Sequence, residues 1–328
     1  MQRIRFRLRF PLRNWMRVWM RIWLRAGLLA GLCGLSAPAL AHLVCVVSSE
    51  QTPVFQQAAD SLLQELQRGG VARSDIALLT LAEYADGSAR TGDLRLLITL
   101  GSEALRQVTQ RGPRAAVLAG LIPRLTYEHL VQDSGRKGAS NIAALYLDQP
   151  FGRQLDLLRL AIPGVHRVGV LWGPESQSQQ ALLGAALQGR GLVLSEGVFA
   201  EGQSLIGPLR SALADADVLL AVADGAVYNA ASVSNILLTS YRARTPVMAF
   251  SPAYVKAGAL LSVHTTPAQA GTQLAAMAAH LLQAGSLPPG QYPADFSISV
   301  NEYVARSLGL TLDAAALTER LRKLEKKP

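Results

Sequence analysis

Short apolar runs alternate with longer amphipathic segments along most of this chain. The run "HLVCVVS" (42–48) precedes "TPVFQQAADSLLQELQRGG" (52–70), in which Pro53 opens a predicted helix and two glycines end it. Further apolar runs occupy residues 75–81, 94–101, 114–121, 141–147, 166–173, 216–224, 245–250 and 258–264. Near-continuous apolar strands that alternate with helices predict parallel sheets covered on both faces. We therefore expect an α/β protein with more than one sheet.

The two halves of this pattern resemble each other. "VVSSEQTPVFQQAADSLLQELQRGG" (46–70) and "VLWGPESQSQQALLGAALQGRG" (170–191) each read as a strand, a polar turn with proline, "QQA", a Leu-rich helix and a glycine. "LLITLGSEAL" (96–105) and "LLAVADGAVY" (219–228) form a second pair in the same order. Any two βα units share some of these features, but two ordered pairs favour two Rossmann-like lobes.

Polar residues follow four of the predicted strands, where ligands of open α/β sheets bind. The junctions are Ser48-Ser49-Glu50, Gly101-Ser102-Glu103, Trp172-Gly173-Pro174 and Asp224-Gly225. Free N–H groups at helix N-termini favour anions, so the serines are candidates to hold a carboxylate. Asp224 is a candidate for an ammonium or hydroxyl group, and we expect Asp224→Ala to abolish binding with little change in melting temperature. Helix capping explains the serines and Asp224 as well.

Aromatic residues supply a second set of candidates. Trp172 is the only tryptophan after residue 41 and ends an apolar strand, where it forms either a flat wall against a ligand or part of the lobe core. Tyr127, Tyr228 and Phe250 are weaker candidates of the same kind.

Residues 20–41, "MRIWLRAGLLAGLCGLSAPALA", have the form of an export signal. A basic start, a short apolar run and the small-x-small end Ala39-Leu40-Ala41 predict cleavage between Ala41 and His42. The Arg- and Trp-rich stretch before them either lengthens the signal and docks on anionic lipid, or is not translated because synthesis starts at Met16 or Met20.

Cleavage changes the meaning of the composition. The whole chain carries a net charge of +9, but the segment 1–41 holds eight arginines and no acid, which leaves 24 basic and 23 acidic residues in the remaining 287. This balance removes the case for a nucleic-acid partner. The single remaining cysteine, Cys45, cannot form an internal disulfide and fits a core position. We expect an exported, periplasmic, monomeric protein.

The chain lacks the patterns that mark catalytic and metal sites. Its five histidines form no HxH or HExxH spacing, and CxxC, GxGxxG after the first strand, GxxxxGK[ST] and GxSxG are absent. We therefore predict no metal, no cofactor and no catalytic residues, and expect that the protein is not an enzyme.

Six segments in order carry a resemblance to a known family. They are "LLITLGSEAL", "ASNIAALYLDQP", "LLRLAIPGVHRVGVLWGPES", "ADVLLAVADGAV", "TPVMAFSPAYVKAGALLSV" and "FSISVNEYVARSLGLTL". Residues 94 to about 310 thereby resemble the ABC-transporter substrate-binding proteins of the family that includes tryptophan- and tyrosine-binding members. The final segment, an apolar strand followed by Asn301 and "VARSLGL", is the most specific.

The resemblance implies a type I periplasmic-binding-protein architecture with hinge crossovers. By position, the resemblance assigns residues 42–145 and 259–285 to lobe one and residues 146–258 and 286–328 to lobe two. The two lobes are expected to close over a ligand by a hinge motion. It marks the 48–50 and 101–102 turns, Trp172, Asp224 and Ser251 as lining the cleft.

Two departures from the family fall near the expected cleft. "SVHTTPAQAG" (262–271) replaces a glycine and an acidic-aromatic pair, and residues 122–138 are more polar and basic than usual. The implied ligand is a small organic solute, with an amino acid one option. The implied partner is an inner-membrane ABC permease. The alternative is a sensory or adaptor protein on the same fold that signals to a membrane kinase or cyclase.

Overall fold

The computed structural model describes residues 43–87, 94–136 and 138–326. Residues 42–328 form one compact unit. The predicted export signal (1–41) and both alternative start positions lie outside the described residues. No helix in the described part of the chain is long and apolar enough to cross a bilayer.

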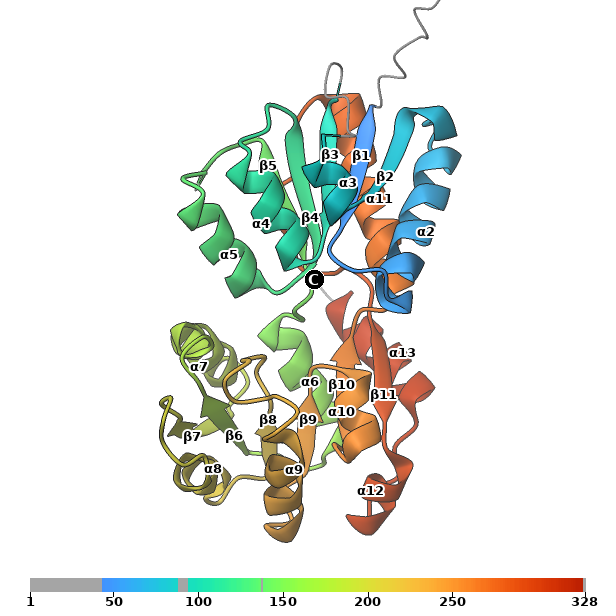
Figure 1. Ribbon diagram of the computed structural model, residues 1–328. Coiled ribbons are helices and arrows are strands. Elements are labelled where there is room, and N and C mark those ends of the chain that lie inside the picture. Colours follow the sequence, from blue (N-terminus) through green and yellow to red (C-terminus); the bar gives the residue numbers. More distant parts are fainter. Residues whose placement is uncertain (1–42, 88–93, 137, 327–328) are drawn as a thin grey trace, which may run out of the picture. The chain divides into compact units, whose positions relative to one another are not determined.

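The first sheet is entirely parallel and has the strand order β2-β1-β3-β4-β5 (Figure 1). The strands are β1 (Val44–Ser48), β2 (Ile76–Thr80), β3 (Leu96–Leu100), β4 (Ala116–Ile122) and β5 (Ile142–Tyr146). The helices are α2 (Pro53–Arg68), α3 (Leu81–Ala85), α4 (Ser102–Gln110), α5 (Arg124–Asp133) and α11 (Pro267–Ala284), with a 3₁₀ turn η1 (Arg73–Asp75).

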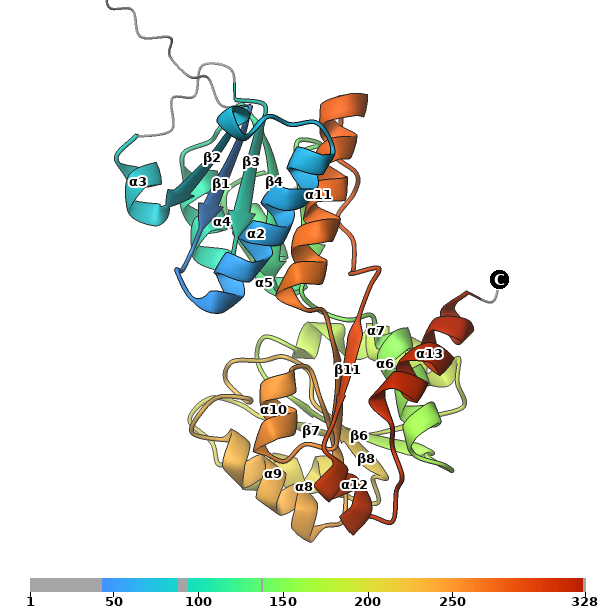
Figure 2. The same cartoon turned by 90° about the vertical axis from the view of Figure 1, so that its right-hand side faces the viewer.

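Alternate residues of β1 point to opposite faces and explain how helices cover both. Val44 and Val46 pack in the core that α2 and α11 close, while Cys45 and Val47 pack in the core of α4 and α5. Helices α2 and α11 lie side by side on one face of the sheet, although some 200 residues separate them (Figure 2). Cys45 is a buried core residue, as the sequence predicts.

The second sheet has the order β11-β10-β9-β8-β6-β7 and is parallel except for β11, which runs antiparallel to β10. Its strands are β6 (Arg167–Trp172), β7 (Val193–Val198), β8 (Val218–Leu220), β9 (Val247–Ala249), β10 (Leu261–His264) and β11 (Ser297–Val300). Its other elements are α6 (Phe151–Ala161), η2 (Gln177–Gln179), α7 (Gln180–Gln188), α8 (Ile206–Leu213), α9 (Val233–Arg242), α10 (Pro252–Ala257), α12 (Glu302–Ser307) and α13 (Ala314–Glu325).

This arrangement confirms the predicted α/β class with parallel sheets, and it corrects two lobe boundaries. Residues 259–264 were expected in lobe one, but β10 pairs with β9 and β11 in the second sheet, so the chain crosses only after His264. Residues from 286 were expected in lobe two, but Gln291 forms a parallel bridge with Leu145 beside the first sheet. In both cases the backbone pairing shows which sheet the segment accompanies.

Candidate functional site

A cavity of about 540 Å³ lies at the carboxyl ends of strands from both sheets. This volume is within the range of pockets that hold small organic molecules. The residues that line it are Val54, Phe55, Leu121, Pro123, Leu147, Asp148, Gln149, Phe151, Gln154, Gln179, Ala221, Val222, Ala223, Phe250, Ser251, Pro252, Ala253, Val263, His264, Thr265, Thr266, Pro267 and Tyr292.

Most of this lining is apolar, and four aromatic residues contribute to it. Phe55 comes from α2, Phe151 from α6, Phe250 from the end of β9, and Tyr292 from the segment between α11 and β11. Aromatic walls bury a large area with few rotatable bonds, which suits the binding of an apolar or ring-bearing group.

Asp148 is the one charged side chain among the described residues that line this main cavity. Its Oδ2 accepts the backbone N–H of Arg124 at 2.6 Å. Burial raises the pKa of Asp148, and the bond from Arg124 opposes this effect. The Arg124 guanidinium is itself engaged, since it donates to Glu128 at 2.7 Å and to the Tyr292 hydroxyl at 2.8 Å.

His264 presents a neutral ring to the cavity. Burial lowers its pKa, because a charged imidazolium would lose solvation. Its Nδ1 lies 3.3 Å from the hydroxyl of Ser262 on the same strand. No lysine or arginine lines the main cavity among the described residues, but the first residues of α6, α10 and α11 do.

Buried hydrogen bonds join the three chain crossings at one side of the cavity. The Gln149 amide donates to the Thr265 hydroxyl at 2.8 Å, and that hydroxyl donates to the Asp295 carbonyl at 3.1 Å. Arg153 donates to Gln149 Oε1 and to the Pro293 carbonyl, both at 2.8 Å, and pairs with Glu325 of α13. Since Gln149 and Thr265 also line the cavity, this network holds part of its wall in a fixed position.

A side compartment of about 220 Å³ adjoins the main cavity. The two share Pro123, Asp148, Gln179, Ala223 and Phe250. The compartment is otherwise lined by Leu125, Thr126, Glu175, Asp224, Gly225, Tyr228 and Tyr254. The described residues contain no group of three or more side chains suited to hold a metal ion.

Asp224 lines the side compartment, but its carboxylate is committed to the fold. It is 3% exposed and accepts the N–H groups of Glu175 (3.0 Å), Ser176 (2.8 Å) and Ala226 (3.0 Å) and the Ser176 hydroxyl (2.9 Å). This corrects the expectation that Asp224→Ala leaves the melting temperature nearly unchanged. Four donors would lose their acceptor in that variant.

The candidates at the ends of β1 and β3 have structural contacts and line neither space. The Ser48 hydroxyl donates to the Glu50 carbonyl at 2.7 Å, and Ser49 Oγ accepts the Ala104 N–H at the start of α4 (2.9 Å). Gly101 has φ of 89°, and a Cβ there would lie 2.6 Å from Ser49 Oγ, so only glycine fits. Ser102 is exposed on the first turn of α4.

The aromatic candidates divide between core and cavity. Trp172 is fully buried in the core of the second sheet, where its indole N–H donates to Glu196, so it packs in the lobe and forms no cavity wall. Tyr127 is buried against Tyr146 and lines neither space. Phe250 and Ser251 line the main cavity, and Tyr228 lines the side compartment.

Several lining residues were not among the candidates. Asp148 and Gln149 directly follow the apolar run 141–147. The rule that selected the other junctions therefore applied to them. Phe55 and Tyr292 carry no comparable signal, because only the packing of distant segments brings them to the cavity.

Comparison with known proteins agrees with this architecture. The family model described as "ABC transporter substrate binding protein" matches residues 93–321. No curated protein matches the chain at a significant level.

Three solved structures share the fold. The ABC domain in complex with L-Trp from Streptococcus pneumoniae has a TM-score of 0.58 at 15% identity and covers 84% of this chain and 97% of its own. A conserved domain protein from Vibrio cholerae has 0.57 at 20%, covering 84% and 97%. A ligand-free, open substrate-binding protein with adhesive properties from Clostridium difficile has 0.65 at 16%, covering 83% and 96%.

The match to the family model spans more than half of the sequence, and the solved structures have the type I periplasmic-binding-protein fold that the sequence resemblance implies. This chain belongs to the family of ABC transporter substrate-binding proteins.

Proposed function

We propose that this protein is the binding component of an ABC importer and captures one small organic ligand in the main cavity. The observation that carries the proposal is the cavity itself, about 540 Å³ with aromatic walls supplied by both lobes. A ligand that touches both lobes stabilises any conformation in which all its contacts are made at once. Hinge closure about the three crossings is therefore the motion we expect on binding.

Delivery to a membrane permease is the role that family membership supports. This role fits an exported protein. Segment 1–41 carries the predicted export signal, and the rest of the chain has a net charge close to zero. The apolar lining favours a ligand with an aromatic or branched body. An aromatic amino acid is one option, since the Streptococcus pneumoniae neighbour was solved with L-Trp.

The test is a ligand screen on residues 42–328, which form a compact unit of their own. Melting temperature and titration calorimetry would be recorded against amino acids, small peptides, sugars, carboxylates and amines. We expect one class to bind in a 1:1 ratio and to raise the melting temperature, because a ligand at a hundredfold excess over Kd stabilises by about 2.7 kcal/mol.

Two tryptophan substitutions on α10 make the site assignment specific. Ala253 lines the cavity and Ala257 does not, while both are exposed on the same short helix. Ala253→Trp should block binding and Ala257→Trp should leave it intact, with similar melting temperatures. Equal binding by the two variants, or no ligand from the whole screen, would refute the proposal.

A further inference from the structure

Leu121 has an unusual backbone conformation for a residue inside a strand. Its φ is 52°, in the left-handed region, where the Cβ of any residue other than glycine crowds the following carbonyl oxygen. Among the described residues, the other non-glycine residues with a positive φ are Asp215 and Arg244, at 55° and 56°. Each follows the C-cap of a helix, α8 or α9, where this conformation is a common way to end a helix. No helix end accounts for Leu121, which lies within β4.

A β-bulge in β4 accounts for it instead. The pairs Ala119–Ala144 and Ile122–Tyr146 enclose two residues of β4 but only one of β5. Side chains of a regular strand alternate between its faces, so Leu121 would point the same way as Ala119, into the core of α4 and α5. The extra residue changes this order: Ile122 packs in that core, and Leu121 packs at the opposite face, against the core of α2 and α11. The bulge thus re-aims a single side chain.

The bulge brings Leu121 to the main cavity. The residue is half-buried and lines the cavity together with Phe55, which also packs against the core of α2 and α11. Gly120 cannot take this role, because α11 passes so close that a Cβ at Gly120 would clash with Leu274. Leu121 is therefore the residue through which β4 contributes an apolar surface to the cavity.

Keeping a leucine at this position costs free energy. Glycine adopts a left-handed φ without a steric penalty, so a fold that needed only the bulge would be better served by glycine. A strained backbone persists only where its surroundings determine it, and such residues cluster at ligand-binding sites. What the leucine adds is an apolar side chain at the cavity.

We propose that Leu121 is a specificity-determining residue that selects the size of an apolar body on the ligand. This inference rests on the proposed function, and it names the substrate class of the same site as a small solute with an apolar body. Leu121 belongs to lobe one, whereas Phe151 and Phe250 line the same cavity from lobe two. A body that touches residues of both lobes stabilises the closed conformation, so its fit against Leu121 changes the affinity.

The experiment measures how residues 42–328 bind apolar bodies of increasing size. Titration calorimetry is carried out with L-valine, L-leucine, L-phenylalanine and L-tryptophan, and with the amines and carboxylic acids that carry the same bodies. Varying the head group keeps the size series independent of the contacts that the head group makes. We expect Leu121→Gly to weaken the best-bound body about tenfold, because the loss of even one methylene contact in an apolar pocket costs about that factor. The other bodies should lose less, so the preference for that body is reduced or lost.

Leu121→Ala separates the side chain from the backbone strain. It removes most of the side chain but keeps a Cβ in the left-handed conformation, so it should have a lower melting temperature than Leu121→Gly. Glycine is less favourable than alanine at ordinary strand positions, so this order is the reverse of the usual one. Both variants should reduce the preference for the best-bound body. The opposite order of melting temperatures would show that Leu121 is unstrained and would overturn the inference.

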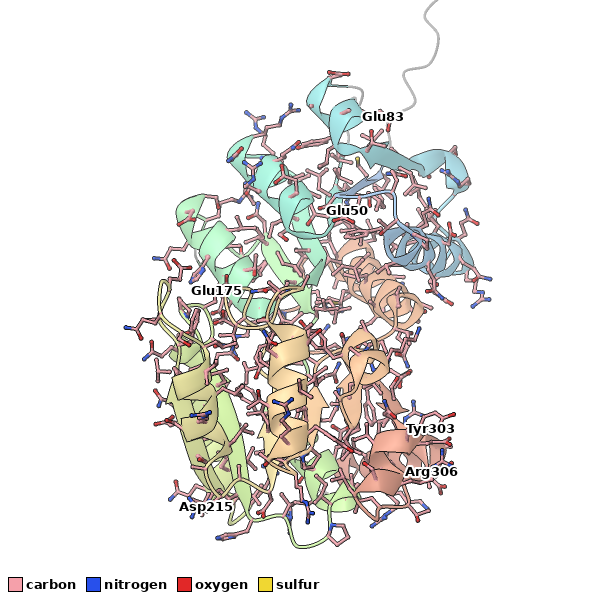
Figure 3. The ribbon with its side chains drawn as sticks, turned by 60° about the horizontal axis from the view of Figure 1, so that its bottom comes forward. Glu50, Glu83, Glu175, Asp215, Tyr303 and Arg306 are labelled. Atoms are coloured by element: carbon pink, nitrogen blue, oxygen red, sulfur yellow. The ribbon has the colours of Figure 1, made fainter. Side chains whose placement is uncertain are left out.

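Asp215→Gly is the matched control for the backbone change. Asp215 has a similar left-handed φ, is exposed on the loop between α8 and β8, where Figure 3 labels it, and lines neither space. Its replacement by glycine should leave every affinity of the series unchanged. A change of preference as large as that of Leu121→Gly would mean that the cavity wall at Leu121 does not select the body.

The outcomes separate this inference from the proposed function. If Leu121→Gly lowers every affinity by the same factor, or lowers none, Leu121 does not select the ligand body and the binding function stands. The same holds if no member of the series binds while the wider screen yields a ligand that Ala253→Trp blocks. If nothing binds in either screen, both proposals fail.

Discussion

The two sheets place the same kind of contact at equivalent junctions, but in opposite directions. In the first sheet, Ser49 follows β1 and accepts the N–H of Ala104, which lies after β3. In the second, Asp224 follows β8 and accepts the N–H groups of Glu175 and Ser176, which lie after β6. Counted from the edge strands β2 and β7, strands β1 and β6 are second in their sheets, and β3 and β8 are third. Each contact therefore joins the ends of the second and third strands of its sheet.

The two contacts differ in strength. A half-buried hydroxyl accepts one N–H in the first sheet, whereas a carboxylate that is 3% exposed accepts four donors in the second. The comparison shows that the polar residue at each of these two junctions, Ser49 or Asp224, is used to hold the fold together. The main cavity is lined mainly by residues at the junctions after β4, β5, β9 and β10, together with residues 221–223 after β8 and Val54 and Phe55 after β1.

We expect the largest effect on stability at the stronger of these two contacts, the one made by Asp224. Asp224→Ala leaves three buried or half-buried N–H groups and the Ser176 hydroxyl without an acceptor, so the free energy of unfolding should fall by about 3 kcal/mol or more. Urea unfolding of residues 42–328 measures it. Asp133→Ala, at an exposed acid that ends α5, is the control. A loss under about 1 kcal/mol would show that Asp224 is not a structural anchor.

A smaller effect is expected at the equivalent contact of the first sheet. Ser49→Ala removes one hydroxyl acceptor from the start of α4, which costs about 1 kcal/mol for a typical helix cap. Ser102→Ala is the matched control, because Ser102 is exposed on the same turn and should change stability by under about 0.5 kcal/mol. Equal losses for the two serines would contradict the capping role of Ser49.

Much of the fold was predictable because hydrophobic periodicity is local. The apolar runs 42–48, 94–101 and 166–173 contain strands β1, β3 and β6, and the repeated pattern corresponds to matching positions in two sheets. The run 258–264 gave a strand but the wrong lobe. This strand belongs to the second sheet because it pairs with β9 and β11. Such pairing joins separate parts of the chain, so the residues of the run itself do not indicate it.

The site was less predictable, for two reasons. The strand-end rule selected residues such as Ser49 and Asp224 whose hydrogen-bonding capacity is used by neighbouring backbone, which the sequence does not display. The rule also gives no weight to residues such as Tyr292, which reaches the cavity from the third crossing. Trp172 ends a strand, as a cavity residue would, but its ring turns into the core of its own lobe.

The smallest effect concerns the pH dependence of stability at Asp148, the charged residue of the main cavity. Burial raises the pKa of Asp148 above its ordinary value of 3.8, so the folded protein holds this proton more tightly than the unfolded chain. The contribution of this group to the free energy of unfolding therefore falls as pH rises from the ordinary pKa through the raised one, and stays lower above it.

Asp148→Asn removes this contribution. The stability of Asp148→Asn relative to the unaltered protein should then be higher at about pH 7 than at about pH 3. Urea unfolding at both pH values measures the difference, and Asp133→Asn, at an exposed acid, should show none of this burial effect. A relative stability of Asp148→Asn that fell with rising pH would mean that hydrogen bonds and nearby charges stabilise the ionised carboxylate by more than burial destabilises it. The site would then hold an ionised Asp148 at no cost before any ligand arrives.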